Sequence, residues 1–159
     1  MLITIAAIGK LKAGAERELL DRFVERAASA GRNLGLTFTL REFPESRAGS
    51  AATRKAEEAA AMLTAVPAGG TLVALDEGGK NLGSRTFAER IAKWRDGGTA
   101  GLVLAIGGPD GHGPTLLEKA ALRLAFGEMT WPHQFARVML AEQLYRAVTI
   151  ISGHPYHRD

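Results

Sequence analysis

Hydrophobic positions follow two different spacings along this chain. Mostly apolar runs at 2–8, 71–75 and 102–106 are typical of strands covered on both faces of a parallel sheet, and the alternating segment 37–43 predicts a further strand. Between these strands, apolar residues recur every three or four positions with polar residues opposite, which is the spacing of an amphipathic helix. This spacing predicts helices at about 15–30, 53–63, 84–96, 114–125 and 135–151.

The segment Phe126–His133 fits neither spacing, and its length suits a brief strand followed by a loop. Strands and helices then alternate from one end of the chain to the other. Such alternation predicts an α/β fold in which an open, mostly parallel sheet lies between helical layers. No repeat, low-complexity run or linker divides the sequence, and 159 residues is an ordinary length for one domain. We therefore expect residues 1–159 to form a single domain.

Composition narrows the class of protein. Hydrophobic residues make up 46% of the chain and charged residues 23%, as in ordinary soluble domains, and no apolar run reaches membrane-spanning length. The N-terminus lacks the regions of a signal peptide, so we expect a cytoplasmic protein with no membrane contact. Because the chain has no cysteine, disulfides, thiolate nucleophiles and cysteine zinc sites are excluded. No spacing such as HExxH indicates a metal site.

The net charge of +3 makes the protein weakly basic. This charge suits a polyanionic partner such as RNA without requiring one, because lysine and arginine are scattered along the chain as on any solvated surface. Phosphate contacts supply most non-specific affinity for RNA. So small an excess of positive charge therefore predicts weak binding to free RNA.

Two of the predicted strands end in segments rich in glycine. The glycine-rich loop 107–113 follows one apolar run, and Asp76–Lys80 follows another. Parallel sheets bind ligands at the carboxyl ends of their strands, and glycine lets the backbone turn sharply and approach a ligand closely. The loops match neither common nucleotide-binding pattern, so plain turns are an equal interpretation. On that interpretation Asp76 and Asp110 stabilise turns, and His112 is expected to be exposed to solvent.

Three of the four histidines lie at or beyond residue 133. His133 follows a Trp-Pro pair, and it is interpreted either as a partly buried histidine with one hydrogen bond or as a functional residue. The tail from His154 onward holds a tyrosine, an arginine and two histidines, which is unusual for a chain end. It either packs Tyr156 against the body of the protein or folds over a site, with Arg158 to bind a phosphate or carboxylate. The sequence contains no nucleophile-elbow motif, so nothing in it favours covalent catalysis.

Six segments together carry a resemblance to one protein family. They are Ala-Ile-Gly-Lys (7–10), Leu-Asp-x-x-Gly-Lys (75–80), Ile-Gly-Gly-Pro-Asp-Gly (106–111), Met-Thr-Trp-Pro-His-Gln (129–134), the run 137–147 and His-Pro-Tyr-His-Arg (154–158). In this order and spacing they resemble the RlmH family, bacterial methyltransferases that act on N3 of a pseudouridine in large-subunit ribosomal RNA. The match runs from the first strand to the last residues, and its C-terminal half is the more specific.

This resemblance implies a SPOUT-type α/β fold whose C-terminal part forms a trefoil knot. It also implies a homodimer, S-adenosylmethionine as the methyl donor, and ribosomal RNA within the large subunit or the whole ribosome as the partner. Carried over by position, the implied cofactor contacts are Leu75, Gly107, Phe126, Gly127, Glu128, Met129, Thr130 and Trp131.

On the same resemblance, the catalytic residues that we predict are His133, His154, Tyr156, His157 and Arg158. A histidine suits removal of the weakly acidic proton of the acceptor nitrogen, Tyr156 suits stacking on the base, and Arg158 suits a phosphate or carbonyl oxygen. The sequence leaves open whether the tail completes the site of its own chain or that of a dimer partner. Two rival functions stay open as well: a methyltransferase of this fold with another RNA acceptor, and an RNA-binding module without activity.

Overall fold

The computed structural model describes residues 1–157, which contain a five-stranded sheet. Its strands lie in the order β2-β1-β4-β3-β5, and every neighbouring pair is parallel. This confirms the predicted α/β fold with an open parallel sheet, whereas the knot stays a prediction. In chain order the elements are β1 (Leu2–Ile8), α1 (Ala15–Gly31), η1 (Arg32–Leu34), β2 (Thr37–Phe43), α2 (Ala51–Leu63), β3 (Thr71–Asn81), α3 (Ser84–Asp96), β4 (Gly101–Ile106), α4 (Pro114–Lys119), β5 (Leu122–Ala125) and α5 (His133–Ser152).

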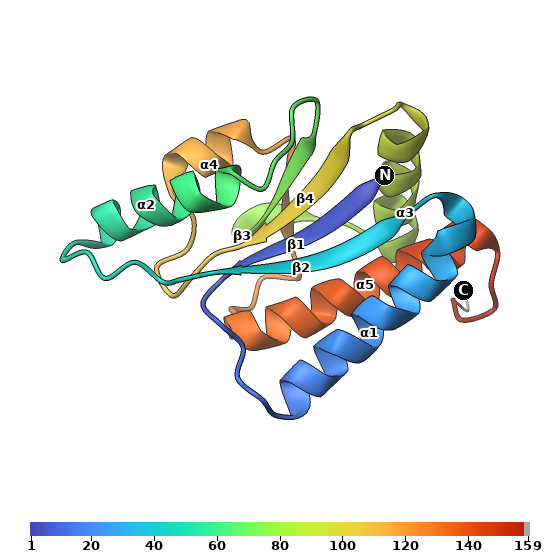
Figure 1. The fold of residues 1–159 in the computed structure, drawn as a ribbon, viewed down its shortest axis with the longest axis horizontal. Helices are drawn as coiled ribbons and strands as arrows, with labels where there is room; N and C mark the ends of the chain where they lie inside the picture. The colour runs from blue at the N-terminus through green and yellow to red at the C-terminus, as the bar shows by residue number, and fades with distance from the viewer. Residues whose placement is uncertain (158–159) are drawn as a thin grey trace.

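Helices cover both faces of the sheet (Figure 1). Helices α1, α3 and α5 pack against the face to which Ile3 and Ile5 of β1 contribute, and α2 and α4 pack against the face of Ala6 and Ile8. The side chains of successive strand residues therefore point into opposite cores, and the central strand β4 is buried along its whole length. Burial on both faces explains why these strands stand out in the sequence as mostly apolar runs.

Most of the predicted elements are confirmed by the structure. Strands β1 and β2 have the predicted bounds, and helices α1, α2, α3 and α5 lie within one or two residues of theirs. At α2 the difference has a visible cause, because the Ser50 hydroxyl accepts a hydrogen bond from the backbone N–H of Thr53 at 3.1 Å and starts the helix at Ala51. Within residues 1–157, none of the helices is long and apolar enough to cross a membrane.

The helix predicted to run from Pro114 to Ala125 is wrong in its second half. Helix α4 ends at Lys119, and β5 follows as an edge strand paired with β3. Within β5 the two leucines point into the core and Arg123 between them is exposed, so this stretch also carries the spacing of a strand. Pairing with β3 supplies backbone hydrogen bonds and decides between the two spacings. The brief strand that was expected within residues 126–133 is instead β5, which ends at Ala125, and residues 126–132 form a loop.

Strand β3 continues to Asn81, well beyond its predicted end. Two of its residues, on either side of the excursion 76–79, both pair with Leu124 of β5. The excursion therefore bulges out of the ladder at the carboxyl edge of the sheet. At Gly79 a Cβ atom would lie 2.7 Å from the backbone of β5, so this close approach requires glycine.

Candidate active site

A cavity of about 470 Å³ opens at the carboxyl ends of β3 and β4. Its walls come from the glycine-rich loop 107–113, the loop 126–132, the excursion of β3 and the first turn of α5. Among residues 1–157, no three side chains of the metal-ligating types gather closely enough to hold an ion. The lining combines the apolar side chains of Leu75, Ile106, Leu117, Leu124, Phe126, Met129 and Trp131 with the ionisable ones of Lys55, Asp76, Glu77, Asp110, His112 and His133.

The glycine-rich loop folds back on itself as a tight turn. The backbone N–H of Gly111 donates to the carbonyl of Gly108 at 3.0 Å, and Gly111 has the left-handed φ of +76°. A Cβ atom on Gly107 would lie 3.0 Å from the carbonyl carbon of Gly111, so even alanine at this position must displace the turn. Backbone rather than side chain therefore forms this part of the cavity wall.

An ion pair fastens the turn to α2. The guanidinium of Arg54 donates to both carboxylate oxygens of Asp110, from Nε at 2.6 Å and from Nη2 at 3.1 Å. Arg54 also donates to the backbone carbonyl of Ala48, which holds the guanidinium in place. Its hydrogen bonds lower the pKa of the Asp110 carboxyl, so this side chain stays ionised. Sequence reasoning interpreted Asp110 as a turn residue and missed its partner, because no local spacing connects positions 54 and 110.

His112 is buried, which corrects the expectation that it is exposed. Only 8% of its surface is accessible, because the turn folds back over the end of the sheet. The ring Nε2–H donates to the backbone carbonyl of Ala105 at 3.2 Å, since a carbonyl can only accept, and Nδ1 is enclosed without a hydrogen-bond partner. Burial lowers the pKa of His112, and the Ala105 carbonyl and the carboxylate of Asp76 oppose that shift only in part. The ring is therefore neutral at physiological pH.

The loop 126–132 has two anchors. The indole Nε1–H of Trp131 donates to the backbone carbonyl of Phe126 at 3.0 Å and closes the loop on itself. The backbone N–H of Gly127 donates to the side-chain oxygen of Asn81 at 2.9 Å, which ties the loop to the end of β3. Met129 between these anchors is 72% exposed. Sequence reasoning missed Asn81, because its role depends on the long extension of β3.

Residues 1–157 match the family model described as "Predicted SPOUT methyltransferase". The chain belongs to the SPOUT methyltransferase family. It is similar over its whole length to curated proteins named "Ribosomal RNA large subunit methyltransferase H". That of Brucella anthropi is 55% identical over 160 residues and covers 100% of both chains. That of Bradyrhizobium diazoefficiens is 55% identical over 159 residues and covers 99% of both chains.

One solved structure also matches this SPOUT methyltransferase. It is a probable methylase family protein from Haemophilus influenzae Rd KW20, with 15% identity and a TM-score of 0.48. The match covers 99% of this chain and 70% of the other. At this distance the likeness adds nothing to the family assignment.

The cavity of this SPOUT methyltransferase contains most of the cofactor contacts that were predicted. Leu75 and Gly107 lie at the strand ends, and Phe126, Gly127, Met129 and Trp131 come from the loop 126–132. Glu128 and Thr130 belong to the same loop but are exposed and do not line the cavity. The structure also places the half-buried His133 in the lining, at the first turn of α5.

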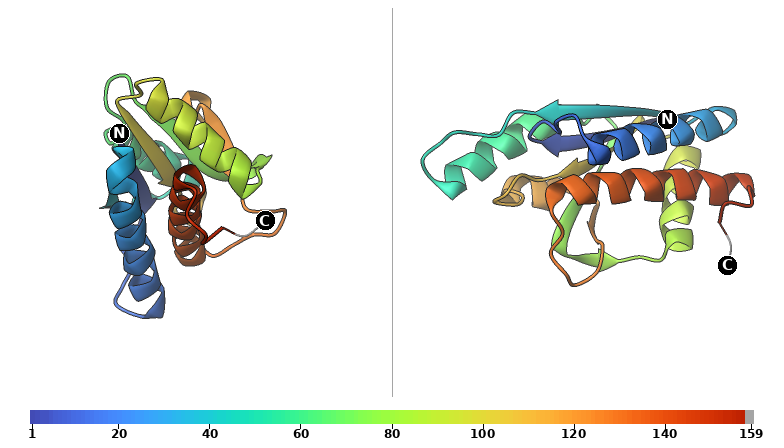
Figure 2. Two further views of the ribbon diagram at one scale, coloured as in Figure 1. Left: turned by 90° about the vertical axis from the view of Figure 1, so that its right-hand side faces the viewer. Right: turned by 90° about the horizontal axis from the view of Figure 1, so that it is seen from below.

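The predicted catalytic residues of the tail lie away from this cavity within one chain. Helix α5 has 20 residues, which corresponds to a length of about 30 Å, and it separates His133 from His154. Figure 2 shows the loop before α5 and the tail after it at opposite ends of the helix. Tyr156 packs instead on the side of α5, and His157 follows it. Arg158 lies outside the described residues.

Arg137 is a buried residue that sequence reasoning did not single out. Its side chain is 1% exposed and lies one turn into α5. The Nη2 group donates to the backbone carbonyls of Ile8 and Gly9, and Nη1 donates to the carboxylate of Glu42 at 2.9 Å. Arg137 thus joins the start of α5, which carries His133, to the end of β1.

Proposed function

We propose that this SPOUT methyltransferase uses S-adenosylmethionine to methylate N3 of a pseudouridine in large-subunit ribosomal RNA, acting on the assembled ribosomal particle in the cytoplasm. The observation that carries the proposal is the cavity at the ends of β3 and β4. It gathers six of the eight cofactor contacts implied by sequence resemblance, in a chain that is similar throughout to proteins named as ribosomal RNA large subunit methyltransferases. RNA is the partner that this similarity favours.

The residues of the cavity suit S-adenosylmethionine. Leu75, Phe126 and Trp131 offer apolar surface for an adenine ring, and the turn after Gly107 offers backbone hydrogen bonds. Lys55 and Asp76 in the lining carry the charges that pair with an amino acid's carboxylate and ammonium groups. When bound, this donor supplies a methyl group on a positively charged sulfur. The chain has to hold the donor and bring the acceptor nitrogen into line with that methyl group.

Proton removal from the acceptor is the second requirement. An imide N–H is weakly acidic, so a base beside it lowers the barrier to methyl transfer. His133 lies in the cavity wall and is the candidate base within the same chain. We propose that four tail residues orient the acceptor nucleotide and contact its phosphate or carbonyl oxygens: His154, Tyr156, His157 and Arg158.

We propose a homodimer in which the tail of one protomer completes the cavity of its partner. The position of the tail supports this arrangement, because Tyr156 packs beside Glu142, about 14 Å along α5 from His133, and does not line the cavity of its own chain. A second cavity of about 570 Å³, bordered by α1, α3 and α5, offers additional surface for a partner protomer. Its lining includes Phe23, Phe87 and Val138.

The acceptor is tested with ribosomes that differ in one nucleotide. Ribosomes from cells lacking this methyltransferase are incubated with the enzyme and isotope-labelled S-adenosylmethionine, and the digested RNA is examined by mass spectrometry. We expect label in N3-methylpseudouridine, and none in ribosomes from cells that also lack the pseudouridine synthase for the target. Label in a different nucleotide would overturn the proposed acceptor, and no transfer to any ribosome would overturn the activity.

The donor site is tested by calorimetric titration with S-adenosylmethionine. A Gly107→Trp variant places a large side chain where a Cβ already meets the turn, so we expect saturable binding by the wild type and none by the variant. Gly49→Trp is the matched control, because nothing lies within 4 Å of a Cβ at Gly49. Equal binding by wild type and Gly107→Trp would place the donor elsewhere.

A further inference from the structure

Tyr156 of the tail rests on three neighbouring side chains of α5. Its hydroxyl donates to Glu142 Oε1 at 3.2 Å, and its ring centroid lies 4.6 Å from that of Tyr145. The guanidinium carbon of Arg146 lies 5.1 Å from the centroid of the Tyr156 ring, within range of a cation–π contact. We refer to Glu142, Tyr145 and Arg146 as the α5 platform.

The α5 platform is fastened by contacts that do not involve the tail. Arg146 Nη2 donates to Glu142 Oε1 at 2.5 Å across one turn of the helix. The ring centroid of Tyr145 lies 6.4 Å from that of Phe23 and 5.9 Å from the guanidinium carbon of Arg26. Both of these residues belong to α1, so two packed helices hold the platform in shape before the tail is considered.

A tight helix end directs the chain back toward the platform. Gly153 follows α5 with the left-handed φ of +69°, and the backbone N–H of His154 donates to the carbonyl of Thr149 at 2.9 Å. Further along, the backbone N–H of Tyr156 donates to Nδ1 of His154 at 3.2 Å. The path from α5 to Tyr156 is thus fixed at both ends.

We propose that Glu142, Tyr145 and Arg146 are positioning residues that hold Tyr156 and so present residues 154–157 as an ordered arm to the RNA-binding side of the partner's cavity. This inference rests on the proposed function. A free tail would lose conformational entropy each time it engaged RNA, and the platform removes much of that loss in advance. The platform therefore raises turnover without touching the donor or the acceptor.

The physical contact is tested through the ionisation of Tyr156. The chain has two tyrosines, so Tyr145→Phe leaves Tyr156 as the only phenol while keeping an aromatic ring in the platform. Burial and the neighbouring Glu142 raise the pKa of Tyr156. Adding Glu142→Gln, which keeps the size of the side chain, should lower the midpoint of the ultraviolet titration and speed hydrogen exchange at 154–157. An unchanged midpoint together with unchanged exchange would overturn the contact.

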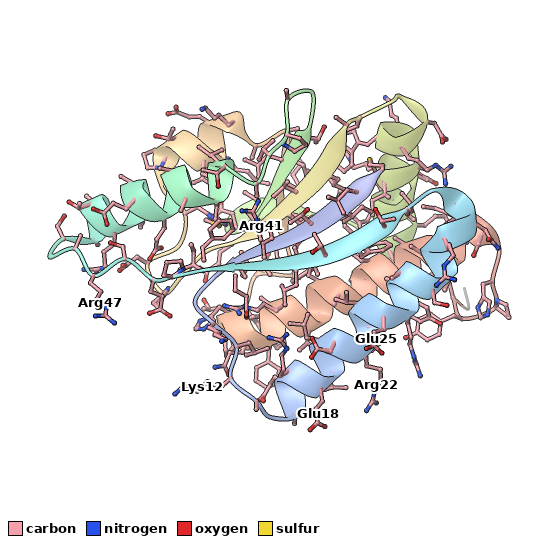
Figure 3. All side chains as sticks on the ribbon, viewed as in Figure 1. Lys12, Glu18, Arg22, Glu25, Arg41 and Arg47 are labelled. Carbon is pink, nitrogen blue, oxygen red and sulfur yellow. The ribbon has the colours of Figure 1, made fainter. Side chains whose placement is uncertain are left out.

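The consequence is tested by turnover on ribosomes with the full-length dimer. We expect Glu142→Gln and Tyr145→Leu to reduce methyl transfer about tenfold, as misplacement of a reacting group does, while affinity for S-adenosylmethionine is unchanged. Glu18→Gln is the control, because this carboxylate lies on the exposed side of α1 (Figure 3) and should leave turnover unaltered. Wild-type turnover by both platform variants would overturn the inference. If the wild type itself transfers no methyl group, the proposed function fails instead.

Discussion

At the scale of single residues, the interior of the glycine-rich turn favours the neutral form of His112 over the protonated form. The ring of His112 is enclosed there, with one nitrogen donating to Ala105 and the other without a partner. A proton on that second nitrogen would be a charge with little solvation, which is why burial lowers the pKa. The position of this ring follows from a loop that returns over the sheet, and a sequence of glycines around a histidine does not reveal that return.

This preference predicts how stability changes with pH. Below the ordinary histidine pKa of 6.5, His112 binds a proton in the unfolded chain but stays neutral in the folded one. The free energy of unfolding therefore falls by up to about 1.4 kcal/mol per pH unit as the pH decreases. His112→Gln should remove this contribution and flatten the free energy of unfolding between pH 7 and pH 5, as measured with urea. His154→Gln, at an exposed position, is the control. Equal slopes for wild type and His112→Gln would contradict the prediction.

At the scale of elements, the sequence predicts a segment well when one spacing fits it alone. β1 is almost wholly apolar and β2 alternates over most of its length, and both have their predicted bounds. β5 fits both a helical and a strand spacing, and only its pairing with β3 resolves the choice. Contacts between distant elements could not be predicted from the sequence either. Arg54 pairs with Asp110 and Asn81 binds Gly127, at sequence separations that no periodicity covers.

The join between α5 and β1 predicts a large effect on stability. Arg137→Met would leave the carbonyls of Ile8 and Gly9 and part of the Glu42 carboxylate without their buried donor. We expect the free energy of unfolding in urea to fall by about 3 kcal/mol, as when one partner of a buried pair is removed.

A neighbouring arginine provides the matched control for this effect. Arg17 also pairs with Glu42, but a third of its side chain is exposed. Arg17→Met should therefore lower the free energy of unfolding by no more than about 1 kcal/mol. Similar losses in the two variants would show that burial of Arg137 adds nothing to its role.

At the scale of the whole molecule, charge is spread rather than gathered. Figure 3 shows acidic Glu18 and Glu25 beside basic Arg22 along α1, with Arg41 and Arg47 farther away on β2 and the segment after it. The net charge is only +3. The surface thus offers few phosphate contacts, in keeping with the scattered lysines and arginines of the sequence.

This surface predicts a preference for an assembled substrate. We expect methyl transfer to purified ribosomal RNA to be at least about tenfold slower than to intact ribosomes at physiological salt, because binding to free RNA depends on phosphate contacts. Steady-state rates at matched RNA concentration measure the difference. Equal rates on the two substrates would contradict it.

The separation of tail and cavity predicts complementation between two inactive variants. Gly107→Trp would block the cavity but keep the tail, whereas a chain ending at Gly153 would keep the cavity but lack the tail. If each tail serves the partner's cavity, a mixed dimer has one complete site, formed by the open cavity of one protomer and the tail of the other. Random mixing of equal amounts should restore about a quarter of wild-type turnover, since half of the dimers are mixed and each has one of two sites.

The same mixture separates the two arrangements that the sequence left open. A tail that serves its own chain would leave both protomers of the mixed dimer inactive, so activity would stay at the level of the single variants. Differently tagged protomers, co-expressed and purified through both tags, give mixed dimers alone and raise the expected recovery to about half. Because Tyr156 packs on the side of α5 and does not line the cavity of its own chain, we expect recovery rather than continued inactivity.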